Sequence, residues 1–225
     1  ADASMAAKWK AKHVVLIGLD GWGAYSVNKA EMPNVKKLME EGSYTLKKRS
    51  VLPSSSAVNW ASMYMGAGPE LHGYTEWGSQ TPELPSRVVN KHGIFPTVFS
   101  LLRESDPKAE IGCICEWAGI RYVVDTLKEL DGYIGQIIQA VKDAGMLDET
   151  IFIVTADHGG IKKGHGGKTM EEMETAFIIA GKGIKKGYEF QESMMQFDCA
   201  STIAYIFGLK QPQVWIGRPM IQVFK

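Results

Sequence analysis

Residues 151–168, IFIVTADHGGIKKGHGGK, decide the fold and place the candidate site. The five apolar or β-branched residues at 151–155 are typical of a buried strand in a parallel sheet. Asp157 and His158 follow where this strand ends, and His165 lies among glycines that we expect to take positive φ and let the backbone approach an ion. A carboxylate and two imidazoles at the carboxyl end of a strand predict a site for Zn²⁺ or a similar cation. The alternative is a solvated turn, and ligands from other segments decide between the two interpretations.

Apolar runs and helix signals alternate along the rest of the chain. Residues 13–19 predict a central parallel strand that ends at Asp20, on the same edge of the sheet as Asp157. Further strands are predicted at residues 43–52, 109–116 and 176–180, and helices at 35–41, 57–65, 95–104, 125–145 and 198–207. We therefore expect a doubly wound, three-layer α/β/α fold with a mostly parallel sheet.

Composition limits the class of protein. With 225 residues, 45% of them hydrophobic, the chain can bury one sizeable core, which predicts a single domain over residues 1–225. Basic and acidic residues number 25 each, and this balance does not favour binding to a nucleic acid duplex. No apolar run reaches the ~20 residues of a membrane span. The first residues, ADAS, fit either a mature exported chain or a tag remnant, and no signal peptide is visible, so export stays open.

The three cysteines are expected to be small core residues. An odd count does not make a disulfide framework. Cys113 and Cys115 lie two apart in a predicted strand, which places both on one face, and Cys199 lies in a predicted helix.

A cluster of serines precedes the predicted helix at 57–65. Serines in this position are usually helix caps, but one of them could be a nucleophile that meets an anion at the helix N-terminus. Ser56 is preferred because the three-residue step to Asn59 puts both side chains on one face of the helix start. In the alternative, Ser56 is only a cap and Ser54 or Ser55 points at the metal.

Several short motifs occur in an order that is informative as a set. They are Leu19-Asp20-Gly21, Met32-Pro33-Asn34 with Leu38 and Glu41-Gly42, Pro53 with its serines and Asn59, Gly66, Leu71-His72-Gly73, residues 155–159 (TADHG) and Gly164-His165-Gly166. This ordered set resembles the alkaline phosphatase superfamily, and most closely its type I phosphodiesterase/nucleotide pyrophosphatase branch. The resemblance covers most of the chain, and it implies an alkaline phosphatase-like fold.

The resemblance also implies a ligand set for two metal ions. Asp20, Asp157 and His158 match the ligands of one zinc, and His165 matches the late histidine of a second zinc. Ser56 matches the nucleophile, which contacts the metal as well. The implied cofactor is Zn²⁺ or another divalent metal such as Mn²⁺.

The implied activity is hydrolysis of small-molecule phosphate esters, of the phosphodiester or nucleotide pyrophosphate type. Ser56 would form a covalent phosphoserine that water then hydrolyses. Asn59 matches the amide that helps to hold the phosphoryl oxygens, and Lys168, a cation in the same loop as His165, is taken as a further substrate-binding residue.

One departure from the family pattern bears on activity. The second zinc needs an Asp-x-x-x-His pair, yet none of the five histidines has an aspartate four residues before it. We expect a deletion, or an omitted segment, near residues 120–125, so an intact two-metal site cannot be built from the residues shown. The alternative function is therefore a degenerate, non-catalytic member with one cation site that binds a ligand or a partner. Oligomeric state is not predicted.

A sulfatase-like sulfuric ester hydrolase is a second alternative. Sulfatases of the superfamily convert a Cys or Ser to formylglycine within Cys/Ser-x-Pro-x-Arg. None of the three serines at 54–56 has Pro two residues on or Arg four residues on. The sequence therefore argues against the formylglycine mechanism.

Overall fold

Strand β3 (Thr150–Thr155) is buried along its whole length and carries the candidate site at its end. It pairs in parallel with β1 (His13–Gly18) and antiparallel with β4 (Glu174–Gly181). Beyond β4 lie β2 (Ser43–Arg49) and the short β5 (Tyr188–Glu189), which gives the order β1-β3-β4-β2-β5 in this computed structural model. The structure describes residues 9–115 and 123–225. Four of these strands run in the same direction and β4 runs against them, so the sheet is mostly parallel, as predicted.

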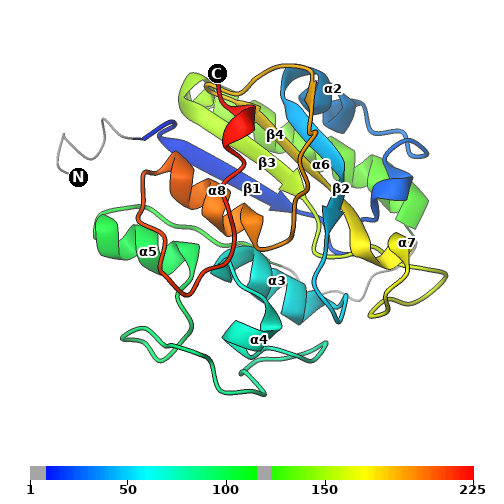
Figure 1. Ribbon diagram of the computed structural model, residues 1–225. Helices are drawn as coiled ribbons and strands as arrows, with labels where there is room; N and C mark the ends of the chain where they lie inside the picture. Colours follow the sequence, from blue (N-terminus) through cyan, green and yellow to red (C-terminus); the bar gives the residue numbers. More distant parts are fainter. Residues whose placement is uncertain (1–8, 116–122) are drawn as a thin grey trace.

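Helices cover both faces of the sheet and confirm the three-layer α/β/α architecture (Figure 1). Helices α2 and α6 cover one face, whereas α3, α5 and α8 cover the other. Their bounds are α2 Pro33–Glu41, α3 Ser56–Met65, α5 Val98–Ser105, α6 Val123–Asp143 and α8 Asp198–Ile206. The short helices are α4 Pro69–His72 and α7 Met170–Met173, and 3₁₀ turns span Ala24–Ser26, Leu147–Glu149 and Ile221–Val223. None of the helices in the described ranges has the length and apolarity that crossing a membrane requires.

Successive side chains of β4 point to opposite faces of the sheet and so contribute to two separate cores. Phe177 and Ile179 pack into the core under α8, and Ile178 between them packs into the core under α2. Because both faces of the strand are buried, it reads as a continuous apolar run rather than as an alternating one.

Two sequence predictions about strands are wrong. Strand β1 was expected in the centre, but it lies at one end of the sheet order and its residues are only half-buried. No strand forms at 109–115: this segment pairs with no strand of the described chain, and Cys113 and Cys115 are exposed rather than in the core. A β-like pattern shows that a segment could pair, but not that a partner edge lies within reach. Cys199 is buried, as predicted.

The expected deletion near residues 120–125 falls partly on residues 116–122, outside the described ranges, and stays a prediction. The helix expected from residue 125 begins at Val123.

His72 ties α4 to α3 from a fully buried position. Its Nδ1 accepts a hydrogen bond from the Tyr74 backbone N–H at 3.1 Å, so the ring proton is on Nε2, which lies 2.9 Å from Ser62 Oγ. The Ser62 hydroxyl in turn donates to the Val58 carbonyl. Burial lowers the pKa of His72 to about 4, because a charged ring would be desolvated.

This histidine should make the fold sensitive to acid. Its folded-state pKa lies below the unfolded value of about 6.5, so its stabilising effect is complete above pH 6.5 and is lost as the pH falls toward 4. The loss should reach about 3 kcal/mol. Urea unfolding between pH 7 and pH 4.5 measures it. The variant His72→Gln should be less stable at pH 7 and show a shallower pH dependence; an unchanged pH dependence would assign the acid sensitivity to other groups.

Candidate metal centre and active site

Asp157 lies fully buried just beyond the end of β3. Its Oδ1 accepts hydrogen bonds from the backbone N–H groups of Gly21 and His158, both at 2.9 Å. Its Oδ2 is buried and has no hydrogen-bond donor. Burial raises the pKa of this carboxyl well above its usual value, and the negative charge of Asp20 raises it further. Buried polar atoms are normally satisfied, so an orphaned carboxylate oxygen calls for a partner such as a cation.

His158 presents a lone pair to two carboxylates. Its Nδ1 lies 2.6 Å from the Gly159 carbonyl, which fixes the ring proton on Nδ1 and leaves Nε2 as an acceptor. This Nε2 lies 3.2 Å from Asp157 Oδ2 and 3.7 Å from Asp20 Oδ1. Burial lowers the pKa of His158, which favours the neutral ring. The Nε2 lone pair therefore faces an oxygen atom of each of the two carboxylates.

These three side chains fit the ligand set of a divalent cation. One ligand atom from each of Asp20, Asp157 and His158 lies within 4.8 Å of the other two. Two carboxylate oxygens and one imidazole nitrogen are donors that Zn²⁺ and Mn²⁺ accept. Asp20, which follows β1 and is 31% exposed in its side chain, gives the cluster its open side. Its other oxygen accepts a hydrogen bond from Trp60 Nε1 at 3.2 Å.

Of the three serines, Ser56 is the one that reaches this cluster. It is the first residue of α3, and its Oγ lies 3.0 Å from His158 Nε2 and 3.5 Å from Asp20 Oδ1. Ser54 Oγ instead donates to the Gly167 carbonyl. Ser55 occupies the N-cap position of α3 without making a side-chain cap, and its Oγ has no partner.

His165 lies against His158 rather than within the cluster. The two rings stack with their centroids 4.0 Å apart and their planes 19° apart. His165 Nδ1 lies 3.2 Å from the Ser54 carbonyl. This contact joins the late loop (residues 159–168), which follows the end of β3, to the serine loop (residues 50–55), which leads into α3. Burial, and next the neighbouring His158, lower the pKa of His165.

The amide of Asn59 does not face the cluster. Its Oδ1 accepts from the Val51 N–H, and its Nδ2 donates to the carbonyls of Val51, Pro53 and Ser55. These bonds hold the serine loop in place, which is a different role from the predicted contact with phosphoryl oxygens. Lys168 is exposed near the far end of the late loop, and no contact brings it to the cluster.

Among the glycines that follow β3, Gly159 is required by close packing and Gly166 by its backbone conformation. Gly166 alone among the five at 159, 160, 164, 166 and 167 has positive φ, at 106°. A Cβ on Gly159 would lie 1.9 Å from the Glu171 carbonyl oxygen, so this position needs glycine because of protein backbone rather than because of an ion.

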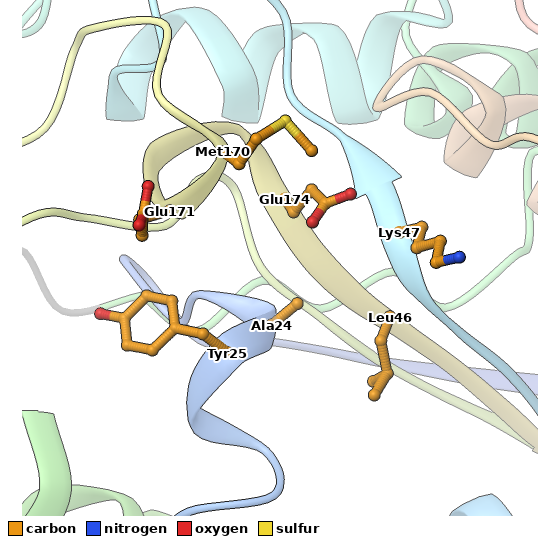
Figure 2. Close-up of a pocket in the computed structure, with 7 residues that line it drawn as sticks. All are labelled: Ala24, Tyr25, Leu46, Lys47, Met170, Glu171 and Glu174. Carbon is orange, nitrogen blue, oxygen red and sulfur yellow. The ribbon is translucent and has the colours of Figure 1, made fainter.

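Two pockets open near the site. One, of about 340 Å³, is lined by residues of the 3₁₀ turn Ala24–Ser26, β2, α7 and β4, including Tyr25, Met170 and Glu171, and contains none of the cluster residues (Figure 2). The other, of about 370 Å³, is lined by Ser55 and His165, together with residues of the 75–77 and 163–166 loops. Ser56 lines neither pocket, but the second one is lined by its sequence neighbour Ser55 and by His165, which stacks on His158.

Comparison with known families gives two matches that follow one another along the chain. Residues 14–99 match the family described as type I phosphodiesterase/nucleotide pyrophosphatase, and residues 104–209 match the sulfatase family. Among solved structures, the chain is similar to human ectonucleotide pyrophosphatase/phosphodiesterase 5 (TM-score 0.72, 10% identity, 94% of this chain and 98% of that one). It is also similar to a phosphonate monoester hydrolase from Silicibacter pomeroyi (TM-score 0.65, 14% identity, 93% and 76%).

Curated relatives match part of the chain. Arylsulfatase K of Danio rerio is 28% identical over 98 residues, which cover 41% of this chain and 19% of the relative. Arylsulfatase K of Bos taurus is 31% identical over 98 residues, covering 41% and 18%. An extracellular sulfatase SULF-1 homolog of Drosophila melanogaster is 28% identical over 104 residues, covering 44% and 9%. This chain thus spans less than a fifth of the length of these relatives.

The fold and the site define a three-layer α/β/α protein with a candidate metal centre at one edge of its sheet. Both family matches and both solved structures support the resemblance to the alkaline phosphatase superfamily that the ordered motifs indicate. The match to the type I phosphodiesterase/nucleotide pyrophosphatase family covers the part of the chain that carries Asp20 and Ser56.

Proposed function

We propose that this protein is a metal-dependent hydrolase of phosphate esters, of the phosphodiester or nucleotide pyrophosphate type, with Ser56 as its nucleophile. The observation that carries the proposal is the position of Ser56 Oγ, 3.0 Å from the imidazole nitrogen that faces Asp20 and Asp157. The match of residues 14–99 to the type I phosphodiesterase model supports the same assignment. Asp20, Asp157 and His158 would hold the cation, with His165 beside them.

The residues of the site fit a two-step ester cleavage. Ser56 Oγ lies within hydrogen-bond distance of His158 Nε2 and Asp20 Oδ1, which would be ligands of the cation, so the hydroxyl would lie beside the bound cation. When bound, Zn²⁺ or Mn²⁺ would lower the pKa of an adjacent hydroxyl and neutralise charge on the phosphoryl oxygens. Attack by Ser56 Oγ on phosphorus would break the bond to one ester oxygen, which would leave as the alcohol with the proton given up by the Ser56 hydroxyl. Water would then cleave the bond between Ser56 and phosphorus, which would release the phosphate monoester and restore the hydroxyl. Asn59 would act by holding the serine loop rather than by touching substrate.

Sulfate ester hydrolysis is the second candidate. It is favoured by the match of residues 104–209 to the sulfatase family and by the curated relatives. Those relatives include extracellular sulfatases, which is consistent with export of this protein. In either case the partner would be a small-molecule ester.

A panel of 4-nitrophenyl esters tests the proposal. The full chain, with added Zn²⁺ or Mn²⁺, should hydrolyse bis(4-nitrophenyl) phosphate faster than 4-nitrophenyl phosphate or 4-nitrophenyl sulfate. A chelator should remove the activity, and added metal should restore it. Faster hydrolysis of the sulfate would favour the second candidate. Hydrolysis of none of the three with either metal would favour a non-catalytic, ligand-binding protein.

A further inference from the structure

Lys48 is a cation in the interior of the protein, with none of its surface exposed. Its Nζ donates three hydrogen bonds, to Thr155 Oγ1 at 2.6 Å, the Ala156 carbonyl at 2.8 Å and Gln196 Oε1 at 2.6 Å. All three acceptors are neutral. Burial lowers the pKa of Lys48 to about 8. Burying an ammonium group without a carboxylate in contact is costly, so a purely structural role explains its presence poorly.

A β-bulge turns this side chain inward. Thr45 pairs with Phe177 and Lys48 pairs with Thr175, so two residues of β2 stand opposite the single Ala176 of β4. The extra residue reverses the alternation of β2, which leaves Lys47 exposed and buries Lys48. Bulges often re-aim side chains next to active sites.

Gln196 carries the effect of Lys48 to the site. While Oε1 accepts from Lys48, Nε2 donates to the Asp157 carbonyl at 2.5 Å and lies 3.3 Å from Asn59 Oδ1. Lys48 thereby fixes which end of the amide faces the site. Asn59 holds the backbone of the loop that leads to Ser56. The Gln196 side chain therefore connects this loop with the strand end that bears Asp157.

We propose that Lys48 is a positioning residue, which acts through Gln196 to hold Ser56 at the correct place relative to Asp157 and His158. Its action on turnover rests on the proposed function. Its action on the shape of the cation site does not, since the Asp157 backbone is held whether or not an ester is cleaved. Residues that orient metal ligands from behind typically change affinity or activity 10- to 100-fold when they are replaced.

The test compares Lys48→Met with Lys47→Met, a matched control on the exposed neighbour in the same strand. Four quantities are measured on the full chain: the Tm without metal, the visible absorption bands of bound Co²⁺, and kcat and KM for bis(4-nitrophenyl) phosphate. Lys48→Met should lower kcat about 10- to 100-fold with little change in KM, and should shift the Co²⁺ bands. Lys47→Met should match the wild type in kcat and in the Co²⁺ bands.

A second variant guards against misfolding of the first. Gln196→Glu keeps an acceptor for Lys48 and removes the two donors that face Asp157 and Asn59, so it should give the same loss of kcat and the same change in the Co²⁺ bands. A changed Tm with wild-type kcat and wild-type Co²⁺ bands in both variants would overturn the proposal and leave Lys48 a structural residue. If the wild type cleaves no ester, the proposed function fails, and the Co²⁺ bands still decide the role of Lys48.

Discussion

Replacing Ser56 with alanine should lower kcat for phosphate ester hydrolysis by about 10³-fold or more, because the attacking oxygen is removed. The fold and the affinity for Zn²⁺ should change little, since Asp20, Asp157 and His158 all remain. Ser56 is not the cap of α3, a position that Ser55 occupies, so loss of its hydroxyl removes no helix cap. Steady-state kinetics and calorimetric titration with Zn²⁺ measure the two quantities.

The neighbouring serines supply the controls for this variant. Ser54→Ala removes bonds to the late loop at Gly166 and Gly167, so it should reduce stability more than Ser56→Ala does. Ser55→Ala removes a hydroxyl that makes no hydrogen bond and should leave the Tm nearly unchanged. Wild-type turnover in Ser56→Ala would refute the assignment of the nucleophile, and a 10³-fold loss in Ser54→Ala or Ser55→Ala instead would move the assignment to that residue.

Replacing Asp157 with asparagine should weaken Zn²⁺ binding at least ~100-fold, because a charged ligand becomes neutral. In the metal-free protein, the same substitution should not reduce the stability of the fold. The folded-state pKa of Asp157 is raised, so the folded protein holds this proton more tightly than the unfolded chain does. Metal-free stability therefore falls as the pH rises through the folded-state pKa. The variant lacks this charge and should be at least as stable as the wild type at neutral pH.

Asp131→Asn is a matched control at a second buried aspartate. The Asp131 carboxylate accepts the backbone N–H groups of Asn34 and Val35 at the start of α2, and it lies outside the cation cluster. This variant should lose stability and keep its Zn²⁺ affinity, the reverse of Asp157→Asn. Chemical denaturation without metal and calorimetric titration with Zn²⁺ separate the two cases. Unchanged Zn²⁺ affinity in Asp157→Asn would exclude that residue as a ligand.

Strand β3, and the convergence of Asp20 and Asp157 at the edge of the sheet where it ends, could be predicted from sequence. The apolar run that became β3 and the position of Asp157 directly after it follow from local pattern alone, and the match of Asp20 to the same edge follows from the parallel pairing of β1 with β3. The spacing of Ser56 to Asn59 selected the serine that the structure brings to His158. These features depend on local sequence and on which strand ends share an edge.

Other features depend on contacts that no local pattern encodes. Lys48 points inward because β2 contains one extra residue. This residue reverses the alternation of inward and outward side chains, so a sequence pattern of period two predicts the wrong face for Lys48. The sequence spacing of Asn59 is the same whether its amide faces substrate or the backbone of its own loop; the hydrogen bonds to residues 51–55 decide this. Gln196 had no sequence signal, since it lies 39 residues from Asp157, whose carbonyl it contacts.

The most direct measurement of the central claim is an anomalous difference map, collected at the zinc absorption edge from crystals of the full chain grown with Zn²⁺. We expect a peak bound by Asp20, Asp157 and His158 Nε2, with ligand distances of roughly 2.0–2.2 Å, and with Ser56 Oγ facing it. A fully occupied zinc peak elsewhere, with His158 Nε2 and both carboxylates left without a cation, would show that these three residues do not form the metal site.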